Sequence, residues 1–283
     1  MSRGGMVNRS WSSTATSARI PGSSRPATSS AWFTQATPVV NASTAASTVI
    51  ACSGRNGFSH SGFPGRPRRS DRTRFTATWI SCSGSALDAL AALPAPQRQA
   101  ARHHLAHLQF ITPRDMGRFA ELGAVANFQP LWACSEIQME ELTLPFIGSE
   151  RALWQYQIGS LLGLGTRIAF GSDWPVSSAD PLQEIHVAVN RVLSERLGRA
   201  GQPETENPFQ PDQAISVDAA VDAFTSGVAW VNHEEDVAGR LLPGMRADVA
   251  VLDQDLFTIA PRDIGSTSVV MTVAGGTVVY GDR

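Results

Sequence analysis

A short apolar run that ends in a carboxylate is the part of this sequence best suited to chemistry. Residues 168–170 are Ile-Ala-Phe and predict a buried strand, and a Gly-Ser turn then places Asp173 at its C-terminal end. Trp174 and Pro175 follow directly and stop the strand. Because the carboxyl ends of the strands face the chemistry in parallel α/β folds, Asp173 is a candidate catalytic or metal-binding residue. The sequence leaves open that Asp173 instead caps the next helix or forms an Asx turn.

A histidine on an earlier predicted strand could share a site with this carboxylate. His107 lies between apolar neighbours within residues 104–110, two βα units before Asp173. A lone histidine there is more often a core residue than a ligand, but imidazole and carboxylate together suit a divalent metal, above all zinc. The carboxylate of such a site can also take a proton from a metal-bound water as it attacks. Two ligands are fewer than zinc needs, so the pair by itself is an incomplete set.

The other polar candidates carry a weaker signal. Gln129, at the end of the intervening predicted strand, could orient a substrate or could serve a helix-capping or loop role. We expect His103 and His104 to face solvent or lie beside the ligands, and His186, inside a predicted helix, to be structural. Cys134 has no histidine at a motif-like spacing, which argues against a thiol nucleophile.

Strands and helices that could position these residues alternate along the chain. Apolar runs predict the strands, and helical periodicity with capping residues predicts the helices. Pro94 closes the first helix, Gly123 ends the second, and Ser216 caps the last. This alternation is typical of a parallel sheet built from βα units. The expected strands are 104–110, 124–128 and 168–170, and the expected helices are 86–93, 113–122, 150–164, 181–199 and 217–226.

The two ends of the chain differ from this central part. Residues 249–253, 269–273 and 277–280 predict a small terminal β-structure with a hairpin at Gly275-Gly276. Residues 1–85 show no periodicity, carry ten arginines against one acid, and predict disorder because they cannot bury enough apolar surface. They could be a natural tail, a transit peptide or a segment read out of frame, and the absence of lysine from the whole chain favours the last. The expected boundaries are 1–85, 86–236 and 237–283.

The overall composition argues against several classes of partner. The net charge of -2 gives no electrostatic reason to expect nucleic acid or an anionic membrane. No apolar run reaches the length of a membrane-spanning helix. The three cysteines show no zinc-ribbon spacing and their odd number argues against a disulfide framework, so we expect a reducing, cytoplasmic compartment.

Several motifs occur together, in order, between about residues 86 and 280. They are His107-Leu108-Gln109, Phe128-Gln129-Pro130, residues 169–176, residues 181–191, Pro243-Gly244, Ala247-Asp248 and Gly275-Gly276. In this combination the chain resembles the metal-dependent amidohydrolase superfamily, in the YtcJ-like branch that includes N-substituted formamide deformylases. The resemblance implies an α/β fold, the C-terminal portion of a (β/α)8 barrel with a small β-sandwich segment.

The resemblance also implies roles for the candidate residues. His107 would be the metal ligand of the sixth barrel strand, and Asp173 the ligand and proton shuttle of the eighth. The family further needs a His-x-His pair, a carboxylate or carboxylated lysine, and a His-Ala-x-Gly-Asp motif, and this sequence has none of them. The His-Ala-x-Gly-Asp motif should fall near residues 76–80. If these residues are translated back into codons and the reading frame is shifted one base earlier, the new frame can encode part of this motif.

A function follows from the resemblance as an expectation. The chain would use zinc-activated water to hydrolyse a non-peptide C–N bond, an amide or N-formyl group of a small molecule, with activity impaired by the missing ligands. The alternatives are a truncated fragment without activity and half of a split barrel completed by a partner chain.

Overall fold

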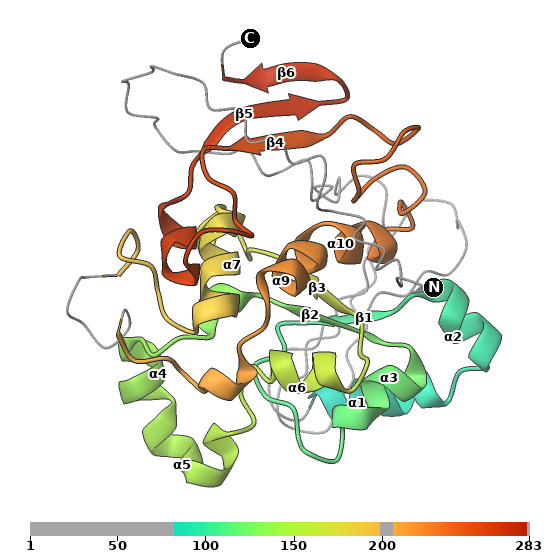
Figure 1. The fold of residues 1–283 in the computed structure, drawn as a ribbon. Helices are drawn as coiled ribbons and strands as arrows, with labels where there is room; N and C mark the ends of the chain where they lie inside the picture. The colour runs from blue at the N-terminus through green and yellow to red at the C-terminus, as the bar shows by residue number, and fades with distance from the viewer. Residues whose placement is uncertain (1–81, 199–205, 282–283) are drawn as a thin grey trace, which may run out of the picture.

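A computed structural model of the protein describes residues 82–198 and 206–281 (Figure 1). The expectations for residues 1–81 lie outside this range. Two three-stranded sheets and several short helices make up the described part, and none of its helices is long and apolar enough to cross a membrane. In chain order the elements are α1 (Cys82–Ala91), α2 (Ala95–Ala101), β1 (His104–Ala106), α3 (Met116–Leu122), β2 (Val125–Phe128), η1 (Pro130–Trp132), α4 (Ile137–Leu142), α5 (Leu144–Ala152), α6 (Ile158–Gly163), β3 (Ile168–Phe170), α7 (Pro181–Asn190), η2 (Pro211–Gln213), α9 (Val217–Phe224), α10 (Ser226–Val231), β4 (Val249–Leu252), η3 (Pro261–Ser266), β5 (Val269–Ala274) and β6 (Thr277–Tyr280).

The three predicted strands of the central region form one parallel sheet in the order β1-β2-β3. All three strands therefore end at the same edge, as the alternation of strands and helices predicted. Alternate residues point to opposite faces: Val125 and Ala169 pack against α10, whereas Ala126 and Phe170 join the main core. Figure 1 shows α1, α3 and α6 on one side of this sheet and α9 and α10 on the other.

Two of the predicted helix ends are confirmed in atomic detail. Gly123 adopts a left-handed conformation after α3, with φ of 66°, and its N–H donates to the carbonyl of Ala120. A residue with a Cβ is strained at such a φ, which is why glycine marks this helix end. Ser216 caps α9 through its hydroxyl, which accepts a hydrogen bond from the Ala219 N–H at 3.2 Å.

Two predicted helices were too long. Residues 150–164 were expected to form one helix, but α5 ends at Ala152 and α6 begins at Ile158. The backbone between them pairs with residues 109–111 instead, and the Ile111 N–H donates to Trp154 O at 3.0 Å. A long-range pairing of this kind cannot be read from local periodicity.

The expected helix 181–199 is wrong for a related reason. The helix α7 ends at Asn190, because Arg191 turns into the left-handed region with φ of 60°. The carbonyl of Arg191 then accepts the N–H of Phe209 at 2.9 Å rather than continuing the helix. The buried side chain of Arg191 also donates through Nε to the carbonyl of Phe209. The two bonds together hold Phe209 against the end of α7.

The chain closes with the antiparallel sheet β4-β5-β6, as predicted. Gly275 and Gly276 form the hairpin between β5 and β6 with φ of 55° and 82°, the signature of a turn that favours glycine at both positions. Before β5, η3 packs on α7, so the terminal part of the chain contacts the helix that follows β3.

Candidate active site

The structure places His107 and Asp173 opposite each other at the carboxyl edge of the parallel sheet. His107 follows the last residue of β1, and Asp173 lies three residues beyond the end of β3. The distance from His107 Nε2 to Asp173 Oδ1 is 3.6 Å, which is longer than a direct hydrogen bond. Their side chains are 34% and 25% exposed, so solvent reaches both. An imidazole and a carboxylate thus share one accessible position, as the sequence predicted from their types and spacing.

His107 lies outside the strand in which it was expected. The predicted strand 104–110 ends at Ala106, and His107 has a φ of 58°. The His107 N–H leaves the sheet and donates to Gln129 Oε1 at 3.0 Å. Asp173 has the same φ of 58°. Left-handed backbone at a residue with a side chain costs about 1–3 kcal/mol and is concentrated at functional sites, so two such residues that face each other are notable.

The side chain of Gln129 bonds to other residues of the protein and does not face solvent. It is buried, its Oε1 accepts the His107 N–H, and its Nε2 donates to Asn127 Oδ1 at 3.1 Å. Both ends of the amide are therefore engaged in holding the exit of β1 beside the exit of β2. Sequence reasoning missed Asn127, a polar residue on β2 whose only signal was its place within an otherwise apolar strand.

The turn that carries Asp173 is closed by its own backbone. The carbonyl of Asp173 accepts the N–H of Val176 at 2.8 Å, and Ser172 Oγ accepts the N–H of Trp174 at 3.3 Å. The helix-capping role that Asp173 might have filled belongs to Asp180, whose Oδ1 accepts the Leu182 N–H at 3.0 Å at the start of α7. The Asp173 carboxylate is therefore left facing His107.

The remaining candidates lie elsewhere. His103 was expected to face solvent or lie beside the ligands, and the first alternative is wrong, because His103 is buried. Its carbonyl accepts the Val125 N–H at 2.9 Å and so joins the sheet. His186 is buried in α7 and accepts the Gly265 N–H through Nδ1 at 3.1 Å. Cys134 is buried and donates from Sγ to the carbonyl of Leu131.

The donor set decides how far a metal site can be built from these residues. His107 and Asp173 have the chemistry of zinc ligands, whereas zinc takes three or four protein ligands. In residues 82–198 and 206–281, no group of three or more His, Cys, Asp or Glu side chains could hold a metal ion. The described residues therefore supply two donors and do not complete a zinc site by themselves.

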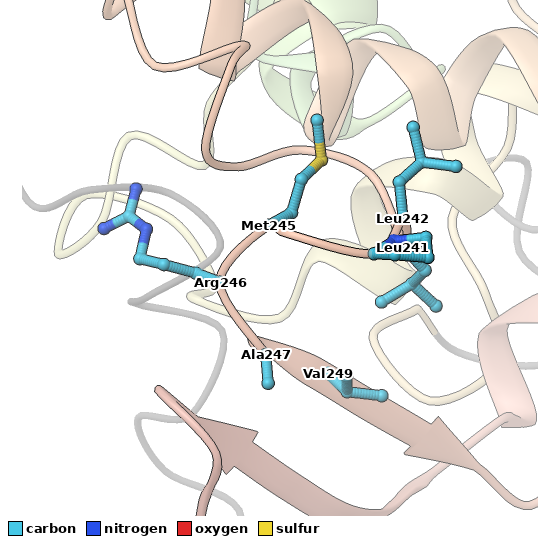
Figure 2. Close-up of a pocket in the computed structure, with 7 residues that line it drawn as sticks. Leu241, Leu242, Met245, Arg246, Ala247 and Val249 are labelled. Carbon is cyan, nitrogen blue, oxygen red and sulfur yellow. The ribbon is translucent and has the colours of Figure 1, made fainter.

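A cavity of about 290 Å³ lies at a different place, between the loop after α10 and β4 (Figure 2). Leu241, Leu242 and Met245 contribute apolar side chains to it, and Val249 projects from β4. Its lining includes neither His107 nor Asp173, so this cavity is separate from the paired residues.

A parallel sheet that carries a histidine and an aspartate at its carboxyl edge has the arrangement of an α/β fold whose site lies at the ends of its strands. The chain belongs to the amidohydrolase family, whose sequence model matches residues 78–280. The expected superfamily is thereby confirmed.

Curated relatives confirm the branch as well. Protein LONG AFTER FAR-RED 3 of Arabidopsis thaliana is 32% identical over 180 residues, covering 63% of this chain and 29% of that protein. Putative amidohydrolase YtcJ of Bacillus subtilis is 26% identical over 185 residues, covering 65% of this chain and 33% of that protein. N-substituted formamide deformylase of Arthrobacter pascens is 27% identical over 125 residues, covering 44% of this chain and 21% of that protein. The chain thus spans a third or less of the length of these relatives.

A solved structure supports the fold. An uncharacterized metal-dependent hydrolase from Pyrococcus horikoshii has a TM-score of 0.53 and 24% identity, covering 67% of this chain and 35% of that chain. The described part therefore shares its mixed α/β arrangement with a segment of a larger protein.

Proposed function

We propose that this chain carries the imidazole–carboxylate part of an amidohydrolase site, which hydrolyses a non-peptide C–N bond of a small amide or N-formyl compound. The observation that carries the proposal is the accessible His107–Asp173 pair at the carboxyl edge of a parallel sheet, in a chain of this family. Residues 86–236 would be the C-terminal portion of a (β/α)8 barrel, and residues 237–283 a segment of its β-sandwich.

Asp173 would hold and move a proton in this reaction. Its carboxylate faces His107 and solvent, so it can accept a proton from an attacking water and return it to the departing nitrogen. His107 would orient the carboxylate and stabilise its charge. His107 and Asp173 would be this chain's donors to a divalent metal, which would activate the attacking water.

A second reading is favoured by the donor count. Since the described residues supply two donors, and their parallel sheet has three strands, a fragment without catalytic activity is the alternative. A (β/α)8 barrel closes with eight strands, so three cannot enclose a site alone.

One experiment separates the two functions. The full chain is purified with zinc, cobalt or manganese, its metal content is measured, and hydrolysis of N-formyl and simple amide compounds is followed by release of formate or amine. Turnover that requires metal and falls at least about a hundredfold in both Asp173→Asn and His107→Asn supports the hydrolase. Glu150→Gln, at an exposed carboxylate on α5, is the matched control and should leave the rate unchanged. Absence of both bound metal and turnover supports the non-catalytic fragment and contradicts the hydrolase.

A further inference from the structure

A buried glutamate lies behind the candidate site and takes no part in the reaction described above. Glu184 is on the first turn of α7 and is 0% exposed. Acidic side chains are almost never fully buried unless they have a specific partner. The contacts of this carboxyl group therefore bear on its role.

One side of Glu184 holds the segment that follows β2. Its Oε2 accepts the Leu131 N–H at 2.6 Å, at the start of η1. Gln129, two residues earlier on the same segment, accepts the N–H of His107. The segment between these two bonds is short, so a movement of Leu131 is transmitted to the backbone of His107.

The other side of Glu184 faces the turn of Asp173. Both Ser177 and Asp173 of this turn act on the pKa of Glu184: the Ser177 hydroxyl lowers it and the charge of Asp173 raises it. Ser177 belongs to the turn itself, because its N–H donates to the carbonyl of Asp173 and its hydroxyl donates to the carbonyl of Ser172. Glu184 thus lies between the segment that follows β2, which holds Gln129, and the turn of Asp173, which follows β3.

The charge state of Glu184 fits this place. Burial raises the pKa of its carboxyl well above the ordinary range, outweighing the opposing N–H of Leu131, and the charges of Asp173 and Asp180 raise it further. Its Oε1 has no hydrogen-bond partner among the described residues, and an ionised oxygen without a donor is costly to bury.

We propose that Glu184 is a positioning residue that, by accepting the Leu131 N–H from α7, holds the segment after β2 against the helix that follows the Asp173 turn, and so keeps His107 and Asp173 face to face. The inference rests on the proposed function for the meaning of that pair, but its geometry is testable without turnover. Two variants test this role. Glu184→Gln keeps a side-chain oxygen that can accept the Leu131 N–H but cannot ionise, whereas Glu184→Ala removes that acceptor.

The readout is the effect of Asp173 on the imidazole of His107. The protein is labelled at histidine, the His107 Cε1–H resonance is assigned by its loss in His107→Asn, and its shift is compared with and without Asp173→Asn at neutral pH. We expect the Asp173-dependent shift in the parent and in Glu184→Gln, and its loss in Glu184→Ala. Glu150→Ala, at an exposed carboxylate, should leave it intact.

Several results would overturn the inference. The inference fails if Glu184→Ala keeps the full Asp173-dependent shift of the His107 resonance, or if Glu184→Gln loses that shift. It also fails if the parent protein does not show the shift. If Glu184→Ala does not fold, Glu184→Asp takes its place, since one methylene fewer withdraws the carboxyl from Leu131 and should also abolish the shift. A full set of expected shifts without hydrolysis would refute the proposed function and leave the positioning role standing.

Discussion

At the scale of single residues, the candidate site depends on backbone as much as on side chains. His107 and Asp173 both adopt a φ of 58°, and neither is a glycine. That a histidine and an aspartate follow the ends of two strands could be predicted, because local sequence patterns indicate where strands end and turns begin. The left-handed conformation and the bond from His107 to Gln129 could not, since they depend on a partner that lies 22 residues away.

The role of Gln129 gives the first prediction. Gln129→Ala removes the acceptor of the His107 N–H and should lower the free energy of unfolding by about 1–3 kcal/mol, because a donor loses its partner in a part-buried position. Urea denaturation of the two proteins measures the change. Gln138→Ala, on the exposed face of α4, is the matched control and should alter stability by less than about 0.5 kcal/mol. A cost for Gln129→Ala no larger than that of the control would contradict the positioning of His107 by this amide.

At the scale of elements, the strands and caps were predictable and the helix lengths were not. The strands β2 and β3 and the hairpin at Gly275-Gly276 lie where the apolar runs and the glycines indicated. The helix α7 stops at Asn190 although its periodicity continues, because the carbonyl of Arg191 is taken by Phe209. Contacts between distant segments outweigh local propensity at such places.

A second element-scale feature is the buried junction between α7 and η3. The side chain of Gln183 donates to the carbonyl of Gly265 at 2.9 Å, and Asn190 donates to the carbonyl of Pro261 at 2.8 Å. His186 accepts the Gly265 N–H, so its Nδ1 must stay unprotonated for the bond to form. The junction thus contains a group that titrates.

The junction should weaken in acid. Burial lowers the pKa of His186 to about 4, and the positive charge of Arg262 on η3 lowers it further. In the unfolded chain the pKa is near 6.5, so between these values the unfolded state binds more protons and stability falls as the pH falls. The stability from this residue is fully present above about pH 6.5, and about 3 kcal/mol is lost by pH 4.

The measurement is urea unfolding between pH 7 and pH 4 for the parent and for His186→Asn, whose Oδ1 can replace Nδ1 as acceptor. Subtracting the two curves removes the contributions of the acidic residues, including the opposite one from Glu184. The parent should lose more stability than the variant across this window. Parallel curves would show that His186 is not held neutral by the fold.

At the scale of the whole molecule, the sequence indicated the α/β class and the family, and both are confirmed. The order of the apolar runs is sufficient for the class, because each predicts a strand and the intervening helices force parallel pairing. The family was inferred from the resemblance of several motifs taken together, among them residues 169–176 and Gly275-Gly276.

The surface of the whole molecule gives the last prediction. The hairpin of α4 and α5 exposes Leu142 and Phe146 to 66% and 77%, together with Ile137 and Leu153. Large apolar side chains gathered on one exposed element drive association, because water is released when they are covered. Replacing Leu142 and Phe146 by Gln should therefore shift the protein toward smaller particles in light scattering, by an amount that grows with concentration. The melting temperature should stay within about 2 °C of the parent, since the two side chains contribute little to the core.

The control is Glu141→Gln, a substitution at a neighbouring exposed residue that removes no apolar surface. An unchanged particle size would mean that association comes from another surface. The first to examine are the edges of the three-stranded parallel sheet, which pair with no further strand among residues 82–198 and 206–281.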